Sequence, residues 1–87
     1  MNISVEISYY PLQDEYVQSI LEFVDRLKSY TELQIKSTGI STQVFGKYSD
    51  VMRVLTLEIE KSFTIPNSVF VLKIINSDLQ IHPNSYE

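Results

Sequence analysis

The chain has 87 residues, no cysteine, one histidine and a formal net charge of −4. This length leaves room for one domain, and without cysteine or a second histidine we expect neither a disulfide bond nor a thiolate or histidine-cluster metal site. The basic residues form no stripe, so we expect no binding to nucleic acid. No apolar run approaches the roughly 18 residues of a membrane span, so we expect no membrane binding. Residues 1–10 do not resemble a signal peptide, and we therefore expect a cytoplasmic protein.

The first third of the chain changes from strand to helix periodicity. Residues 2–10 alternate between polar and apolar side chains, which predicts a strand with one buried face that ends near Pro11. Residues 13–28 place apolar side chains every three or four positions, which predicts an amphipathic helix. The stripe consists of Val17, Ile20, Leu21, Val24 and Leu27.

The remaining elements follow in a similar order. Residues 32–37 and 41–45 predict two strands of a hairpin that turns at or near Gly39, where a positive φ is expected, and Gly46 closes the second strand. Ser49 is expected to cap a second helix that reaches Phe63. Residues 68–75 form the most apolar predicted strand.

This order of elements predicts a particular fold. Two strand–helix–strand units with right-handed crossovers place both helices on one face of an antiparallel sheet. We therefore predict an α+β, ferredoxin-like βαββαβ domain over residues 1–76, with a four-stranded sheet whose first and third strands are central. Residues 77–87 are expected to form a polar C-terminal tail.

The predicted fold leaves one sheet face uncovered by helices. By alternation, the first strand contributes Ser4, Glu6, Ser8 and Tyr10 to this open face. The last strand contributes Val69, Val71 and Lys73. A face of this mixed character is suited to burial against another subunit or to holding a ligand.

Residues typical of catalysis are scarce. The chain has no cysteine nucleophile, and two glycines cannot form a glycine-rich phosphate loop. Small ferredoxin-like enzymes similar to acylphosphatase carry arginine and glycine after the first strand, whereas residues 9–13 read YYPLQ. His82 in the tail is a poor candidate base, and Glu58 and Glu60 are expected to be helix-surface charges. We therefore expect no enzyme, no catalytic residue, no metal and no cofactor.

Three features each allow two interpretations. Glu6 either faces solvent and pairs with Lys73, or contacts a ligand through its carboxylate. The hydroxyls of residues 37–42 either shape a turn or hydrogen-bond a polar heterocycle. Four tyrosines, at positions 9, 10, 16 and 48, belong either to a core or subunit contact or to the wall of a flat ligand.

Three segments resemble the thiamine-binding, YkoF-like family. They are residues 7–12 (ISYYPL), residues 38–46 (TGISTQVFG) running into residues 48–52 (YSDVM), and residues 71–74 (VLKI), and the middle segment is the most specific. The resemblance covers roughly residues 3–76. It implies a ferredoxin-like domain that forms homodimers or homotetramers through its sheets and binds thiamine or its hydroxymethylpyrimidine part without catalysis.

The resemblance also suggests which residues meet the ligand. An aminopyrimidine needs an acceptor for its amino group and partners for its ring nitrogens, and a cationic thiazolium is favoured beside a carboxylate and aromatic rings. The predicted ligand-binding residues are Glu6, Ser8, Tyr10, Thr38, Ser41 and Thr42, with Tyr9 as an alternative wall to Tyr10. The competing function is a ligand-sensing or purely structural oligomerisation module of the same fold.

Overall fold

The computed structural model describes residues 1–80 and contains six elements in the predicted order. They are β1 (Asn2–Pro11), α1 (Tyr16–Lys28), β2 (Gln34–Ser37), β3 (Thr42–Lys47), α2 (Tyr48–Ser62) and β4 (Ser68–Ile75). Residues 81–87 of the predicted tail, including His82, lie outside the described residues.

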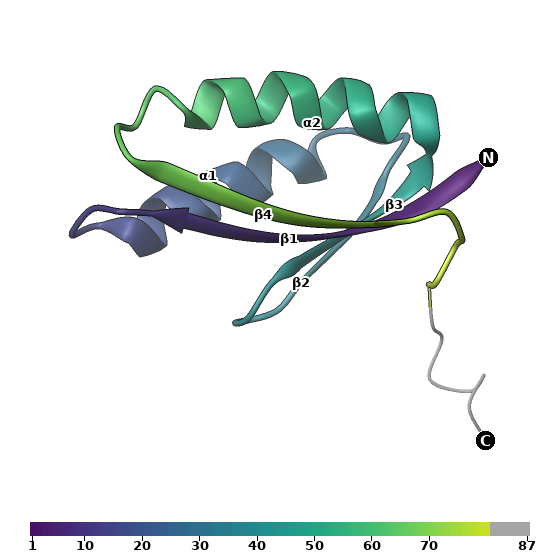
Figure 1. Ribbon diagram of the computed structural model, residues 1–87, viewed down its shortest axis with the longest axis horizontal. Helices are drawn as coiled ribbons and strands as arrows, with labels where there is room; N and C mark the ends of the chain where they lie inside the picture. The colour runs from purple at the N-terminus through teal and green to yellow at the C-terminus, as the bar shows by residue number, and fades with distance from the viewer. Residues whose placement is uncertain (81–87) are drawn as a thin grey trace.

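The four strands form one antiparallel sheet in the order β2-β3-β1-β4. Both helices lie on one side of this sheet (Figure 1). The ferredoxin-like α+β fold is therefore confirmed, with β1 and β3 at the centre. The core lies between the helices and the inward side chains of the sheet, with Ile3, Val5, Ile7, Phe23, Leu27, Val44, Val51, Val54 and Leu55 among its buried members.

Two local predictions about the connections are wrong. Helix α2 begins at Tyr48 directly after β3, and Lys47 precedes it as the cap residue, so Ser49 lies inside the first turn. Gly39 does not have a positive φ. The turn is stabilised by Thr38 instead, whose Oγ1 accepts hydrogen bonds from the backbone N–H groups of Ile40 and Ser41.

The other glycine, Gly46, is required for close packing. A Cβ atom at this position would lie 2.9 Å from Leu33 Cδ2 and 3.3 Å from a methyl group of Val51. Such distances are shorter than ordinary contacts between side chains, so a larger residue here would have to displace the ends of the Leu33 and Val51 side chains.

Glu58 is buried rather than a helix-surface charge, with 1% of its surface exposed. Arg26 Nε of α1 donates to its Oε1 at 2.7 Å, and the Tyr30 hydroxyl donates to its Oε2 at 2.5 Å. Lys61 Nζ lies 3.3 Å from the same Oε2. A buried carboxylate needs such partners, and this one ties α1 and the following loop to α2.

Candidate functional site

The face of the sheet opposite the helices carries the predicted polar side chains. In the antiparallel register Glu6 lies opposite Gln43 of β3 and Lys73 of β4, and Ser4 lies opposite Phe45 and Ile75. Directly opposed residues project to the same side of a sheet, so these side chains share the open face. The prediction that Val69, Val71 and Lys73 lie on this face is confirmed, because they oppose Tyr10, Ser8 and Glu6.

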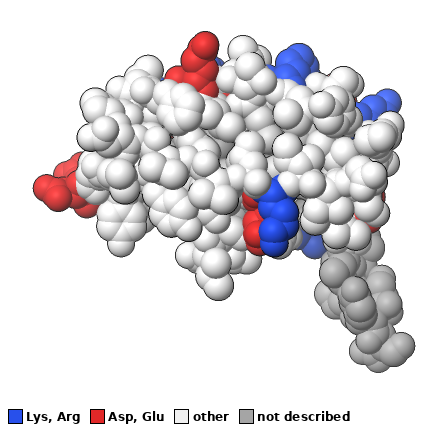
Figure 2. All heavy atoms as spheres, in the orientation of Figure 1, with Lys and Arg blue, Asp and Glu red and all other residues white. Residues whose placement is uncertain are grey.

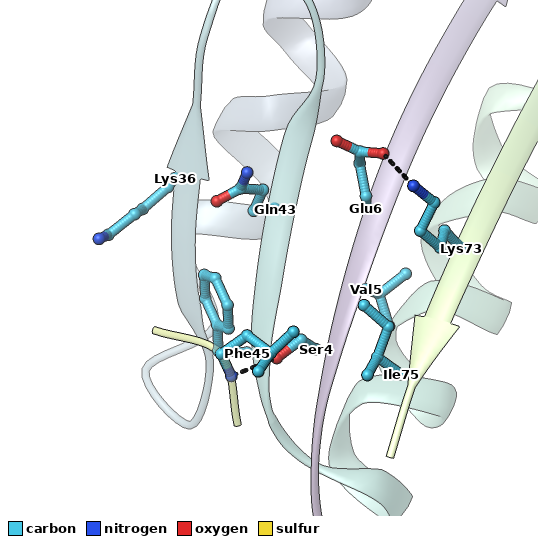
Figure 3. Close-up of a pocket in the computed structure, with 9 residues that line it drawn as sticks. Ser4, Val5, Glu6, Lys36, Gln43, Phe45, Lys73 and Ile75 are labelled. Atoms are coloured by element: carbon cyan, nitrogen blue, oxygen red, sulfur yellow. Dashed lines mark hydrogen bonds and ion pairs between the residues drawn. The ribbon is translucent and has the colours of Figure 1, made fainter. Parts of the chain in front are cut away.

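A hollow of about 440 Å³ occupies this face (Figure 3). Its volume lies within the range of roughly 300–1,000 Å³ that is typical of small-molecule sites. It is bordered by Ser4, Val5, Glu6, Lys36, Gln43, Phe45, Lys73, Ile75 and Leu79. The polar groups of Glu6, Gln43 and Lys73 lie at one end, and Ser4, Phe45 and Ile75 lie at the other (Figure 3).

Glu6 is the accessible acidic group of the hollow. Its Oε1 lies 3.6 Å from Lys73 Nζ, which confirms the predicted pairing, and its Oε2 accepts a hydrogen bond from Ser41 Oγ at 3.2 Å. The Glu6 side chain is 42% exposed and that of Lys73 is 69% exposed. An ion pair this exposed contributes about 0–1 kcal/mol, so a cationic or amino-bearing ligand can replace the lysine at little cost.

The other predicted ligand residues fall into two groups. Ser8 and Tyr10 lie on the open face beyond Glu6, opposite Val71 and Val69, and Ser41 joins them through its bond to Glu6.

Thr38 and Thr42 do not border the hollow, and neither do Ser8, Tyr10 and Ser41. The Thr38 hydroxyl is used in the turn, as the turn interpretation predicted. Thr42 opposes the inward residue Ile7, is buried, and its Oγ1 lies 3.3 Å from Ser37 Oγ on the helix side of the sheet.

The four tyrosines singled out in the sequence differ in how exposed they are. Tyr9 is 8% exposed and belongs to the core, where its ring stacks on Phe70 at a centroid distance of 4.2 Å and meets Phe23 edge-on at 5.3 Å. Its hydroxyl has no hydrogen-bond partner among the described residues. Tyr10, Tyr16 and Tyr48 are each about half exposed. Tyr10 is therefore the tyrosine of β1 that faces the open side.

Several residues of the hollow were not predicted from the sequence. Gln43 and Phe45 follow from strand alternation once Val44 is recognised as buried, so their signal was present. Leu79 comes after the last strand, and no periodicity indicates its position.

Other kinds of site have little support in the described part of the chain. Residues 1–80 contain no group of three or more His, Cys, Asp or Glu side chains placed to hold a metal ion. None of the helices described is long and apolar enough to span a membrane.

A second depression, of about 350 Å³, lies between α2 and β4. It is bordered by Met52, Leu55, Thr56, Ile59, Glu60, Phe63 and Leu72. This surface is mainly apolar, and it adjoins the outer edge of β4, which has no partner strand within residues 1–80.

Comparisons with known proteins agree with the fold. A family model described as YKOF-related Family matches residues 2–66. Protein SP2199 from Streptococcus pneumoniae has 21% identity and a TM-score of 0.81, covering 91% of this chain and 90% of its own. The candidate thiamine biosynthesis/salvage protein TM0486 from Thermotoga maritima has 15% identity and a TM-score of 0.81, covering 93% and 91%. No curated protein matches the chain.

Proposed function

Because this chain belongs to the YKOF-related family, we propose that it is a non-catalytic binding protein for thiamine or its hydroxymethylpyrimidine part. The observation that carries the proposal is the hollow on the open sheet face, where an accessible carboxylate and an amide lie at one end and an aromatic side chain lies at the other. The structural similarity to a candidate thiamine biosynthesis/salvage protein supports the same ligand class.

The chemistry of the hollow suits an aminopyrimidine. Glu6 is a hydrogen-bond acceptor for the exocyclic amino group, and the Gln43 side chain offers both a donor and an acceptor for ring nitrogens. Phe45 borders the hollow and, being 5% exposed, offers a ligand only a small part of its aromatic side chain. The positive charge of a thiazolium is favoured near the Glu6 carboxylate.

The predicted ligand residues take different parts in this proposal. Glu6 and Ser41, which already share a hydrogen bond, are the primary polar contacts. Ser8 and Tyr10 extend the same face and contact the distal part of the ligand. Thr38 and Thr42 act indirectly, because their hydroxyls shape the hairpin that presents Ser41.

We further propose that the chain associates with copies of itself through the edge of β4. Four side chains of this strand, Val69, Val71, Leu72 and Ile74, are each between 37% and 56% exposed. The face seen in Figure 2, which has β4 in front, carries few Lys, Arg, Asp or Glu side chains. Antiparallel pairing of two β4 edges would satisfy their backbone groups and cover apolar surface.

The alternative function, an oligomerisation module without a ligand, is supported by this same edge. The two functions differ in what they require of the hollow, because only the binding function requires that a ligand can reach the Glu6 carboxylate. Titration calorimetry with thiamine, and separately with hydroxymethylpyrimidine, distinguishes them.

We expect saturable binding at micromolar or lower concentration, with about one site per chain. Glu6→Gln should weaken it about ten-fold or more, because a hydrogen bond to a charged group is lost. Glu22→Gln, on the exposed face of α1, is the matched control and should leave the affinity unchanged. Absence of heat at millimolar ligand would contradict the binding function.

A further inference from the structure

The segment after β4 turns back and lies against the open face. Beyond Ile75 the chain bends at residues 76–77 and then meets Ser4 of β1. Ser4 Oγ donates a hydrogen bond to the Ser77 carbonyl oxygen at 2.7 Å, and the Leu79 backbone N–H donates to the same Oγ at 2.8 Å. One hydroxyl therefore holds the segment at two backbone positions that are two residues apart.

Ser4 is well suited to this task. It is 5% exposed although it lies on the face that the helices leave open. A buried hydroxyl must be hydrogen-bonded, and that of Ser4 both donates and accepts. Alanine at this position would leave the Ser77 carbonyl and the Leu79 N–H without their partner, so the contact between the segment and the sheet depends on the hydroxyl.

The segment contributes an apolar side chain to the hollow. Leu79 borders it together with Phe45 and Ile75, and is 46% exposed. These three side chains come from the tail, β3 and β4, and they bring an apolar surface to a hollow whose other end carries Glu6 and Gln43. A half-exposed leucine at the border of a hollow gains from being covered by the apolar surface of a ligand.

We propose that residues 77–80 form one wall of the binding site, with Leu79 as a ligand contact and Ser4 as the positioning residue that holds the wall. The ligand contact rests on the proposed function; the attachment of the wall to Ser4 does not. Because the segment is held mainly by two hydrogen bonds, a ligand that touches Leu79 stabilises the wall, and a stable wall strengthens ligand binding.

Thiamine titrations of four full-length variants test the contact. Leu79→Ala should weaken thiamine binding about five- to ten-fold, whereas Leu21→Ala, which removes an exposed leucine from α1, should not change it. Ser4→Ala should weaken binding to a similar extent, and Ser4→Thr, which keeps the hydroxyl, should restore most of the affinity. Equal affinities for the unchanged chain and Leu79→Ala would overturn the contact.

Amide hydrogen exchange without ligand tests the attachment independently. The Leu79 amide of the unchanged chain should exchange at least about ten-fold more slowly than in an unstructured peptide, and Ser4→Ala should remove this protection. Exchange at the unstructured rate in the unchanged chain would overturn the wall itself. If the unchanged chain bound no thiamine, the proposed function and the Leu79 contact would both fail, and the exchange rate alone would decide whether the wall exists.

Discussion

The buried carboxylate of Glu58 provides a quantitative test of how the two helices are held together. Glu58→Gln keeps the shape of the side chain but removes the negative charge that interacts with Arg26, Tyr30 and Lys61. Removing one partner of a buried pair costs about 3–5 kcal/mol, and a lower value of about 3 kcal/mol is expected here because Arg26 is 33% exposed. For a domain of this size that loss lowers Tm by about 12–24 °C.

The pH dependence of this loss identifies its cause. Burial by itself raises the pKa of Glu58, but hydrogen bonds from Tyr30, Arg26 and Lys61 outweigh it, so the pKa lies below its ordinary value of 4.5. A carboxyl whose pKa is lower in the folded state contributes stability above about pH 4.5, and this contribution is lost as the pH falls through the folded pKa.

Urea unfolding followed by circular dichroism at pH 7 and at pH 3 measures this effect. The difference in unfolding free energy between the unchanged chain and Glu58→Gln should be largest at pH 7 and should shrink in acid. Glu60→Gln, an exposed neighbour on α2, is the control and should change stability by less than about 0.5 kcal/mol. An equal difference at both pH values would show that the charge of Glu58 is not the source of the stability.

Three further predictions concern the site, the edge and the turn. Lys73→Met should raise the affinity for thiamine about two- to five-fold in calorimetry, because the lysine competes for Glu6; weaker binding would contradict this competition. Leu72→Asp should reduce the mass measured by light scattering to that of a single folded chain, and an unchanged mass would argue against pairing through β4. Gly39→Ala should leave the midpoint of urea unfolding unchanged or slightly raised, since the residue lacks a positive φ and its Cβ would meet no atom within 4 Å; a lowered midpoint would refute this account of the turn.

The fold could be predicted because each element carries its own periodicity. The change from period two in residues 2–10 to helical spacing after residue 13, and its repetition later in the chain, left few topologies once right-handed crossovers were required. The start of α2 was missed because Lys47 ends β3 and caps the helix at once, without the intervening loop that a capping Ser49 requires. The burial of Glu58 was missed because its partner Arg26 is 32 residues away in sequence.

The site was predictable only in part. Alternation along β1 placed Glu6 and Ser8 on the open face, and the register confirms it. Thr42 was grouped with them by its hydroxyl chemistry, although it shares the parity of the buried Val44 and so lies on the opposite face. Leu79 could not be placed from the sequence, because its position depends on a bend after β4 and on hydrogen bonds to Ser4.

Chemical-shift mapping of the amides during a thiamine titration tests most directly whether the hollow on the open face binds thiamine. We expect the largest shifts at Glu6, Gln43, Phe45, Lys73 and Leu79, which border the hollow on the open face. Shifts concentrated on the helix side of the sheet, around Thr42 and Ser37, or no shifts at millimolar thiamine, would contradict it.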